Sequence, residues 1–195
     1  MILQKISKKK IIFITGGSGY VGSNLIKLLL KKKFFIFALS RKVRKNKNNL
    51  KWIKNSEIKK INTALKISNI LIHLSAAGVY KKESLSLLKK KNVLEPLKLL
   101  DRAYHLNCKK WIILGSCFEY GNNLEAVNFK SILRPIDNYA KSKIEFFKKI
   151  FSRTKYKDVR LLYLRLFHAY GNNEPKKRLY PSLIFSIKKK SIFEM

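Results

Sequence analysis

Short apolar runs rich in β-branched residues alternate along the chain with longer stretches in which apolar residues recur at helical spacing. This alternation is typical of a parallel sheet whose strands are joined by helices packed on its faces. Strands are expected at residues 11–15, 34–39, 50–53, 70–74, 111–114 and 159–166. Helices are expected at residues 20–30, 58–67, 84–106, 138–151 and 181–189. The third helix should kink at Pro96, because proline cannot donate the helical hydrogen bond. Six strands in this order predict one α/β domain with a Rossmann-type, doubly wound parallel sheet.

A glycine-rich turn follows the first expected strand. In the segment IIFITGGSGYVGSNLIKLLL, Gly16, Gly19 and Gly22 are spaced three residues apart. Gly16 allows a tight turn, Gly19 lets the backbone approach a pyrophosphate, and Gly22 lets the helix pack close to the strand. The helix is expected to begin at Tyr20, and its first amides, including that of Val21, would face the anion. Between a strand and a helix, this spacing predicts a dinucleotide-binding site.

The end of the second expected strand bears on which dinucleotide binds. An acidic residue there would bind the ribose 2′-hydroxyl and indicate NAD, but the chain reads Ala-Leu-Ser-Arg-Lys at residues 38–42. Ser40 and Arg41 suit the 2′-phosphate of NADP, through a hydroxyl and a charge-assisted pair. NADP is therefore expected. NAD stays open, because Arg41 is only one of 44 basic residues.

A candidate for acid–base chemistry lies in the segment DNYAKSKIEFF, where Tyr139 and Lys143 share one helix face. Free tyrosine has a pKa of about 10, so proton transfer near neutral pH needs a fall of roughly three units. A neighbouring ammonium, together with the positive nicotinamide of an oxidised cofactor, would favour the phenolate. Ser116 lies just past the fifth expected strand, where it could hydrogen-bond the reacting oxygen. Taken alone, each feature also fits a surface pair or a turn serine.

Further motifs accompany these residues. They are TGGSGYVG, IHLSAAG at residues 72–78, Asn92, the stretch at residues 116–121, Tyr139 with Lys143, and LRLFHAYG at residues 164–171. In order and spacing they resemble the NAD-dependent epimerase/dehydratase family of extended short-chain dehydrogenases. The resemblance covers essentially the whole chain and implies an NAD(P)-binding Rossmann domain over residues 1–195. It implies that Ser116, Tyr139 and Lys143 form a catalytic triad, in which Lys143 also holds the nicotinamide ribose.

The expected cofactor site comprises Gly16, Gly19, Tyr20, Val21, Gly22, Ser40, Arg41, His73, Ala76, Ala77, Asn92, Tyr139 and Lys143, and the expected substrate site comprises Ser116 and His168. The resemblance implies that His73, Ala76 and Ala77 line the cofactor, although a histidine after an apolar strand is more often a core residue.

Departures from the family pattern narrow the expected activity. Sugar-nucleotide dehydratases of the family usually follow the catalytic hydroxyl with an Asp-Glu pair that eliminates water, whereas Cys117 and Phe118 stand here. Dehydration is therefore disfavoured. His168 replaces a common asparagine near the substrate diphosphate. Together with GSCFEYG, this variant resembles bacterial sugar-nucleotide 4-reductases and epimerases of surface-polysaccharide pathways. An NAD(P)-dependent 4-keto reductase or epimerase acting on a nucleotide-activated sugar is therefore expected.

The net charge of +33 at pH 7 raises an alternative, because strongly basic proteins often bind polyanions. The excess is mostly lysine spread along the chain, and it comes with abundant Ile, Asn and Phe, as A/T-rich codons would give. The lysine runs also lack regularly interleaved aromatics that could stack bases. Specific nucleic-acid binding is not expected. A non-catalytic module that binds RNA or another polyanion, or an inactive fragment, remains the alternative.

Cellular context is indicated only broadly. Cys108 and Cys117 lie in different expected elements without metal-ligand spacing, so neither a disulfide framework nor a metal site is indicated. No apolar run approaches the roughly 18–20 residues that cross a bilayer, and no signal peptide is evident. A cytoplasmic protein without a membrane partner is expected, with a homodimer as the assembly considered. Family members normally continue into a small substrate domain, most of which we expect to be missing.

Overall fold

Six parallel strands form a single sheet in the computed structural model, which describes residues 10–79, 81–122, 126–152, 156–171, 174 and 178–189. The strands are β1 (Ile11–Thr15), β2 (Phe35–Ser40), β3 (Leu50–Lys54), β4 (Ile70–His73), β5 (Lys110–Ser116) and β6 (Arg160–Leu166). Their order across the sheet is β3-β2-β1-β4-β5-β6. This is the doubly wound Rossmann order, so the predicted fold is confirmed.

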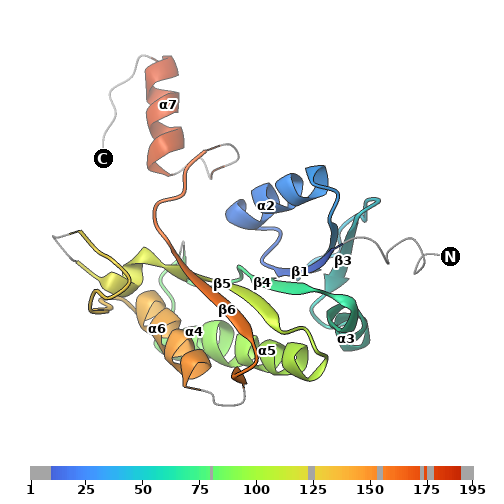
Figure 1. Ribbon diagram of the computed structural model, residues 1–195. Helices are drawn as coiled ribbons and strands as arrows, with labels where there is room; N and C mark the ends of the chain where they lie inside the picture. Colours follow the sequence, from blue (N-terminus) through green and yellow to red (C-terminus); the bar gives the residue numbers. More distant parts are fainter. Residues whose placement is uncertain are drawn as a thin grey trace.

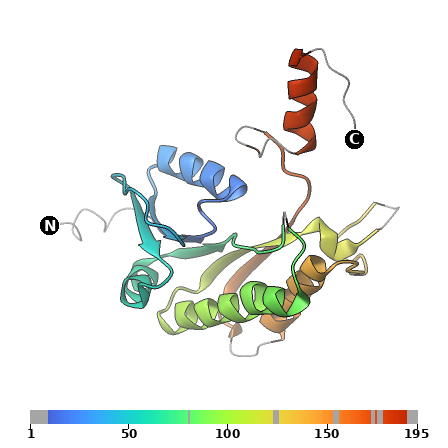
Figure 2. The ribbon, with the colours of Figure 1, turned by 180° about the vertical axis from the view of Figure 1, so that it is seen from behind.

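Helices cover both faces of the sheet. They are α2 (Tyr20–Lys31), α3 (Ile58–Ile67), α4 (Leu85–Lys89), α5 (Glu95–His105), α6 (Asn138–Phe151) and α7 (Leu179–Lys189). Figure 1 shows α2 on one face and α3, α5 and α6 on the other, and Figure 2 shows the same layers from behind. In both views α7 projects away from the sheet, and none of its residues is buried. Among the described helices, none is long and apolar enough to span a bilayer.

The core follows the pattern of a parallel sheet buried on both faces. All five residues of β1 are buried. Phe13 packs with Trp111 and Leu100 in a cluster on the side of α5 and α6, whereas Ile14 packs with Ile26 of α2 in a second cluster. The central strand therefore anchors both layers, and its C-terminal end at Thr15 lies at the switch point between β1 and β4, where such folds bind ligands.

Most expected elements are found with ends displaced by two residues or fewer. The long helix expected at residues 84–106 is instead divided by η1 (Lys90–Leu94), a π-helical turn that ends just before α5, whose first turn contains Pro96. The irregularity found is thus a π-helical turn before Pro96, whereas the sequence predicted a kink at the proline itself. Ser116 is the last residue of β5 rather than a residue beyond it, and it begins η2 (Cys117–Tyr120), a 3-10 turn that the sequence pattern did not reveal.

Candidate active site

The glycine turn between β1 and α2 has two positions where a side chain would not fit. Gly16 has a φ of +70°, and a Cβ there would lie 2.7 Å from the carbonyl carbon of Leu74. A Cβ on Gly22 would lie 2.2 Å from the carbonyl oxygen of Gly16. The predicted roles of these two glycines, a tight turn and close packing of the helix, therefore agree with the geometry.

Gly19 differs, because a Cβ there would meet only the Gly16 carbonyl oxygen, at 3.3 Å. Gly19 is the N-cap of α2, which has no side-chain cap and no acidic residue in its first turn. The N-terminus of α2 carries the positive end of the helix dipole, and no acidic side chain in the first turn opposes an anion there. The open side of Gly19 and this helix end suit an anion such as a pyrophosphate.

The C-terminal end of β4 is tied to that of β1. The His73 Nδ1 and Thr15 Oγ1 atoms are 2.8 Å apart, and both side chains are buried. Burial, reinforced by the charge of Lys143, lowers the pKa of His73 to about 3, so the imidazole is neutral at physiological pH. Beyond β4, Ala76 is exposed and Ala77 is half-buried. His73 therefore holds the strand ends together, while Ala76 is open to a ligand.

Asn92 fixes the loop after β4 against α6. Its Oδ1 accepts a hydrogen bond from the Ala77 amide at 2.7 Å. Its Nδ2 donates to the Ala77 carbonyl and to Ser142 Oγ, both at 3.0 Å. The side chain is buried, so its polar atoms are engaged within the protein. Asn92 thus positions the predicted cofactor loop rather than presenting its own amide to the surface.

The structure brings the three predicted catalytic residues together. Ser116 ends β5, and its side chain lies close enough to that of Tyr139 to affect the pKa of the phenol. Tyr139 lies in the first turn of α6, where Asp137 caps the helix by accepting a 2.6 Å hydrogen bond from the Ala140 amide. Lys143 lies one turn further on, buried, with its Nζ 2.5 Å from the Leu114 carbonyl oxygen to which it donates. The sheet edge and the helix therefore supply one cluster.

The electrostatics of this cluster differ from the sequence expectation. Burial raises the pKa of Tyr139 to about 12, while the hydrogen bond with Ser116 acts in the opposite direction. Lys143 was expected to lower that pKa, but its ammonium is directed to the Leu114 carbonyl, and burial of the phenol outweighs the stabilisation of its anion. Burial likewise lowers the pKa of Lys143 to about 8, against an opposing effect of Glu119.

Glu119 is a residue of the cluster that the sequence reasoning missed. Its carboxylate is fully buried beneath Ser116 and forms an ion pair with Arg165 of β6, Oε2 to Nε, at 2.7 Å. Ser116 and Glu119 also form a capping box around η2. The Ser-x-x-Glu spacing typical of that box was the available sequence signal. No comparable signal connects Glu119 to Arg165, because only strand pairing brings them together.

Phe118 connects Tyr139 with His168, the residue predicted to bind substrate. The Phe118 ring lies edge-on to both, with centroids 6.4 Å from Tyr139 and 6.3 Å from His168. Phe118 is 46% exposed, and His168 is exposed as well. An apolar aromatic surface therefore lies beside the tyrosine ring, where the resemblance to the family's dehydratases would imply a carboxylate.

At the end of β2, the structure adds a second arginine to the predicted pair. Ser40 is buried, and its Oγ accepts hydrogen bonds from the Lys42 amide at 3.2 Å and from Arg44 Nε at 3.3 Å. The Arg44 guanidinium also lies 5.1 Å from the centre of the Trp52 ring. Arg41 is exposed. The Ser40 hydroxyl is thus already hydrogen-bonded within the protein, and the side chains of Arg41 and Arg44 follow close to the end of β2.

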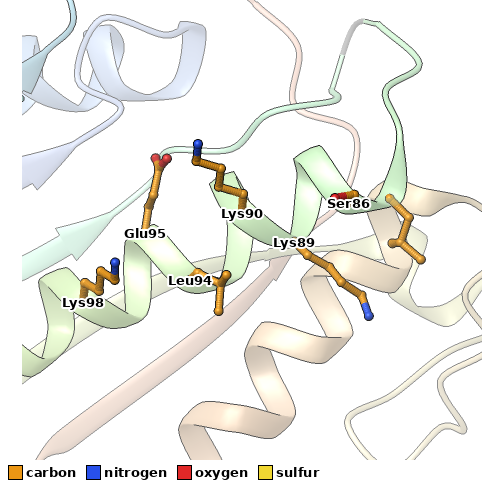
Figure 3. Close-up of a pocket in the computed structure, with 7 residues that line it drawn as sticks. Ser86, Lys89, Lys90, Leu94, Glu95 and Lys98 are labelled. Atoms are coloured by element: carbon orange, nitrogen blue, oxygen red, sulfur yellow. The ribbon is translucent and has the colours of Figure 1, made fainter.

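A separate hollow of about 760 Å³ opens on the outer surface of α4, η1 and α5 (Figure 3). It is lined by Leu85, Ser86, Lys89, Lys90, Leu94, Glu95 and Lys98. None of the predicted site residues lines this hollow. It therefore carries no argument for the active site.

Comparison with known proteins supports the family resemblance. The model of the NAD dependent epimerase/dehydratase family matches residues 12–194. The CDP-abequose synthase of Salmonella typhimurium is 28% identical over 189 residues, which cover 93% of this chain. The chain spans about 60% of the length of the curated relatives that it matches.

Solved structures show the same fold. The UDP-glucuronic acid 4-epimerase of Bacillus cereus, in complex with NAD, has a TM-score of 0.78 at 18% identity, covering 93% of this chain and 63% of that one. The enzyme WbmG of Bordetella bronchiseptica, in complex with NAD and UDP, has a TM-score of 0.75 at 21% identity, covering 92% and 60%. At these identities the likeness establishes the fold alone.

Proposed function

The chain belongs to the NAD-dependent epimerase/dehydratase family, and on that premise we propose that it carries the cofactor site and catalytic residues of an NAD(P)-dependent enzyme acting on a nucleotide-activated sugar. The reaction proposed is 4-keto reduction or epimerisation in surface-polysaccharide biosynthesis. The observation that carries the proposal is the meeting of Ser116, at the end of β5, with Tyr139 and Lys143 of α6, where Lys143 Nζ donates to the Leu114 carbonyl of β5 at 2.5 Å.

The residues present fit a dinucleotide. Gly16 and Gly22 allow the turn, and Gly19 with the N-terminal end of α2 at Tyr20 and Val21 would hold the pyrophosphate. Ala76 and Ala77 would line the nicotinamide side, and Lys143 would hold its ribose. When bound, the nicotinamide supplies the hydride exchanged with the sugar carbon.

We propose NADP as the preferred cofactor. Ser40 anchors Arg44, and Arg41 is free to turn toward a ligand at the same strand end. A phosphate on the adenosine ribose would meet two guanidinium groups there, whereas no acidic side chain is available at residues 38–45 to accept a ribose hydroxyl. NAD remains the alternative, since the two solved neighbours named above are complexes with NAD.

The proton chemistry is assigned to Tyr139. Its pKa of about 12 keeps the hydroxyl protonated near neutral pH, which suits donation of a proton to a keto oxygen as the carbon is reduced. Ser116 would hold that oxygen against the phenol and stabilise the phenolate that remains. The ammonium of Lys143 favours the phenolate at longer range. A protonated phenol therefore suits the proposed keto reduction, in which the sugar oxygen receives a proton.

Two observations support a nucleoside diphosphate sugar as substrate. The net charge of +33 attracts a diphosphate. His168 would lie near the diphosphate of the bound substrate. The curated relatives are named as synthases of CDP-abequose, and the solved neighbours include a UDP-glucuronic acid epimerase. Phe118 beside Tyr139 offers an apolar wall and no carboxylate for eliminating water, so dehydration is not part of the proposal.

A cytoplasmic location and a homodimer complete the proposal. Both cysteines, Cys108 and Cys117, are free thiols, as expected in a reducing compartment. Sedimentation of the purified protein at several concentrations measures the assembly, and a monomer throughout would remove the dimer from the proposal.

The test is turnover of CDP- and UDP-linked 4-keto sugars with NADPH. Tyr139→Phe should lower kcat by about 10²–10⁴-fold while leaving NADPH affinity nearly unchanged, because only proton transfer is removed. Ser116→Ala should behave in the same way, whereas Lys143→Ala should lower affinity and rate together. Tyr104→Phe, at the opposite end of the sheet, is the matched control. A Tyr139→Phe protein as active as this control would refute the assigned mechanism.

A further inference from the structure

The carboxylate of Glu119 contacts both the strand that ends at Ser116 and the neighbouring strand β6. It is fully buried, and its Oε1 accepts hydrogen bonds from the Ser116 amide at 2.8 Å and from Tyr163 Oη at 2.9 Å. Its Oε2 accepts from Arg165 Nε at 2.7 Å. One side chain thus fixes the backbone of Ser116, at the end of β5, to two residues of β6.

The network reaches α6 as well. Tyr163 Oη also lies 3.5 Å from the carbonyl oxygen of Lys143, within the helix that carries Tyr139. The Arg165 guanidinium lies over the rings of Tyr120 and Phe147, with centroids 5.1 and 4.7 Å away. The contacts with these two rings therefore hold the Arg165 guanidinium in place, and its ion pair holds the Glu119 carboxylate.

Glu119 and Tyr163 pack closely against Gly115. A Cβ on Gly115 would lie 2.7 Å from Glu119 Oε1 and 2.4 Å from Tyr163 Cε1. Any side chain before Ser116 would therefore displace Glu119 and Tyr163 from these positions. A buried ionic group is costly without partners, and here the Arg165 pair and the two hydrogen bonds supply them.

The charge of Glu119 also acts on the reacting groups. It raises the pKa of Lys143 against the effect of burial, which keeps the ammonium charged. Together with Asp137 and Cys117, it adds to the rise in the pKa of Tyr139. Both effects preserve the protonated forms of the two residues.

We propose that Glu119, held by Arg165, is a positioning residue that fixes the Ser116 hydroxyl relative to Tyr139 for the proton-transfer step. The inference rests on the proposed function, because it assigns Ser116 to the reacting oxygen. Its geometric part, a backbone amide locked by a buried carboxylate, can be measured without turnover.

The experiment compares Glu119→Met, which removes the acceptor at similar length, with Glu119→Gln, which keeps a carbonyl oxygen for the Ser116 amide. Glu119→Met should lower kcat on the order of 10²-fold, the effect of small displacements on oriented reactions, with KM and NADPH affinity changed less than about threefold. Glu119→Gln should recover most of kcat. Tyr156→Phe, which loses a core hydrogen bond to Asp101 away from the site, is the control for loss of stability.

Amide hydrogen exchange gives the measurement independent of turnover. Exchange at Ser116 should be faster in Glu119→Met by at least about tenfold and near parental in Glu119→Gln, with Ile113 of the same strand unchanged. Unchanged exchange at Ser116 in Glu119→Met would overturn the inference whether or not the protein is active. So would equal kcat losses for Glu119→Met and Tyr156→Phe. A parent protein without turnover, but with the expected exchange pattern, would instead count against the proposed function.

Discussion

Lys143→Met should stabilise the protein while weakening its cofactor site. Lys143 is buried, and burial lowers its pKa from 10.5 to about 8. At about 1.4 kcal/mol for each pH unit, the charged side chain costs the folded state on the order of 3 kcal/mol at neutral pH. Methionine has similar length and no charge, but it gives up the hydrogen bond to the Leu114 carbonyl, a loss of about 1 kcal/mol.

The net gain in the free energy of unfolding of Lys143→Met is therefore about 2 kcal/mol, or roughly 4–8 °C in Tm for a chain of this size.

This gain in stability depends on pH. Below about pH 8 the lysine is protonated in both the folded and unfolded states, so its full cost is present. Between pH 8 and 10.5 the folded state releases its proton first, and the cost disappears. The advantage of Lys143→Met should shrink across this interval and reverse above it.

Urea unfolding of parent and variant at several pH values from 7 to 10.5 measures the difference directly. Lys141→Met, an exposed position on the same helix, is the matched control and should change stability by less than about 0.5 kcal/mol. A Lys143→Met protein destabilised equally at every pH would refute the reasoning, because it would mean that the buried ammonium is not a cost to the fold.

Two further predictions concern the cofactor site. Arg41→Ala and Arg44→Ala should each weaken NADPH binding by about 1.5–3 kcal/mol and NADH binding far less, as measured by fluorescence titration; equal losses for both cofactors would contradict the NADP assignment. Gly19→Ala should weaken cofactor binding with little change in Tm, whereas Gly22→Ala should destabilise the protein by about 1–3 kcal/mol, because its Cβ would meet the Gly16 carbonyl oxygen at 2.2 Å. Similar melting temperatures for the two alanine variants would show that the turn tolerates both.

Features that depend on local sequence were predictable. The short β-branched run at residues 11–15, followed at once by glycines, is typical of a buried strand, and those glycines fix a turn that few other residues allow. The spacing of Tyr139 and Lys143 placed them on one helix, and the position of Ser116 after an apolar run placed it at the sheet edge. Family motifs then gave these residues a common role.

Features that depend on distant contacts were not predictable in this way. Glu119 and Arg165 are separated by 46 positions, and only the pairing of β5 with β6 brings them together. Arg44 lies beyond β2, yet it reaches back to Ser40 through its side chain. The rise in the pKa of Tyr139 in the protein without cofactor could not be predicted either, because spacing along a helix reveals a neighbouring charge but not the burial that opposes it.

The edge formed by β1, β4 and β5, with α6, is proposed to exchange hydride with a nucleotide sugar. NADPH with both hydrogens at C4 replaced by deuterium should be incubated with CDP- and UDP-linked 4-keto sugars, and the products analysed by mass spectrometry. We expect one deuterium in each reduced sugar, formed by Tyr139→Phe at a rate about 10²–10⁴-fold below that of the parent; for an epimerase, the oxidised cofactor should instead interconvert the 4-epimers. Neither label transfer nor epimerisation, in a protein shown to bind the cofactor, would contradict the proposed function.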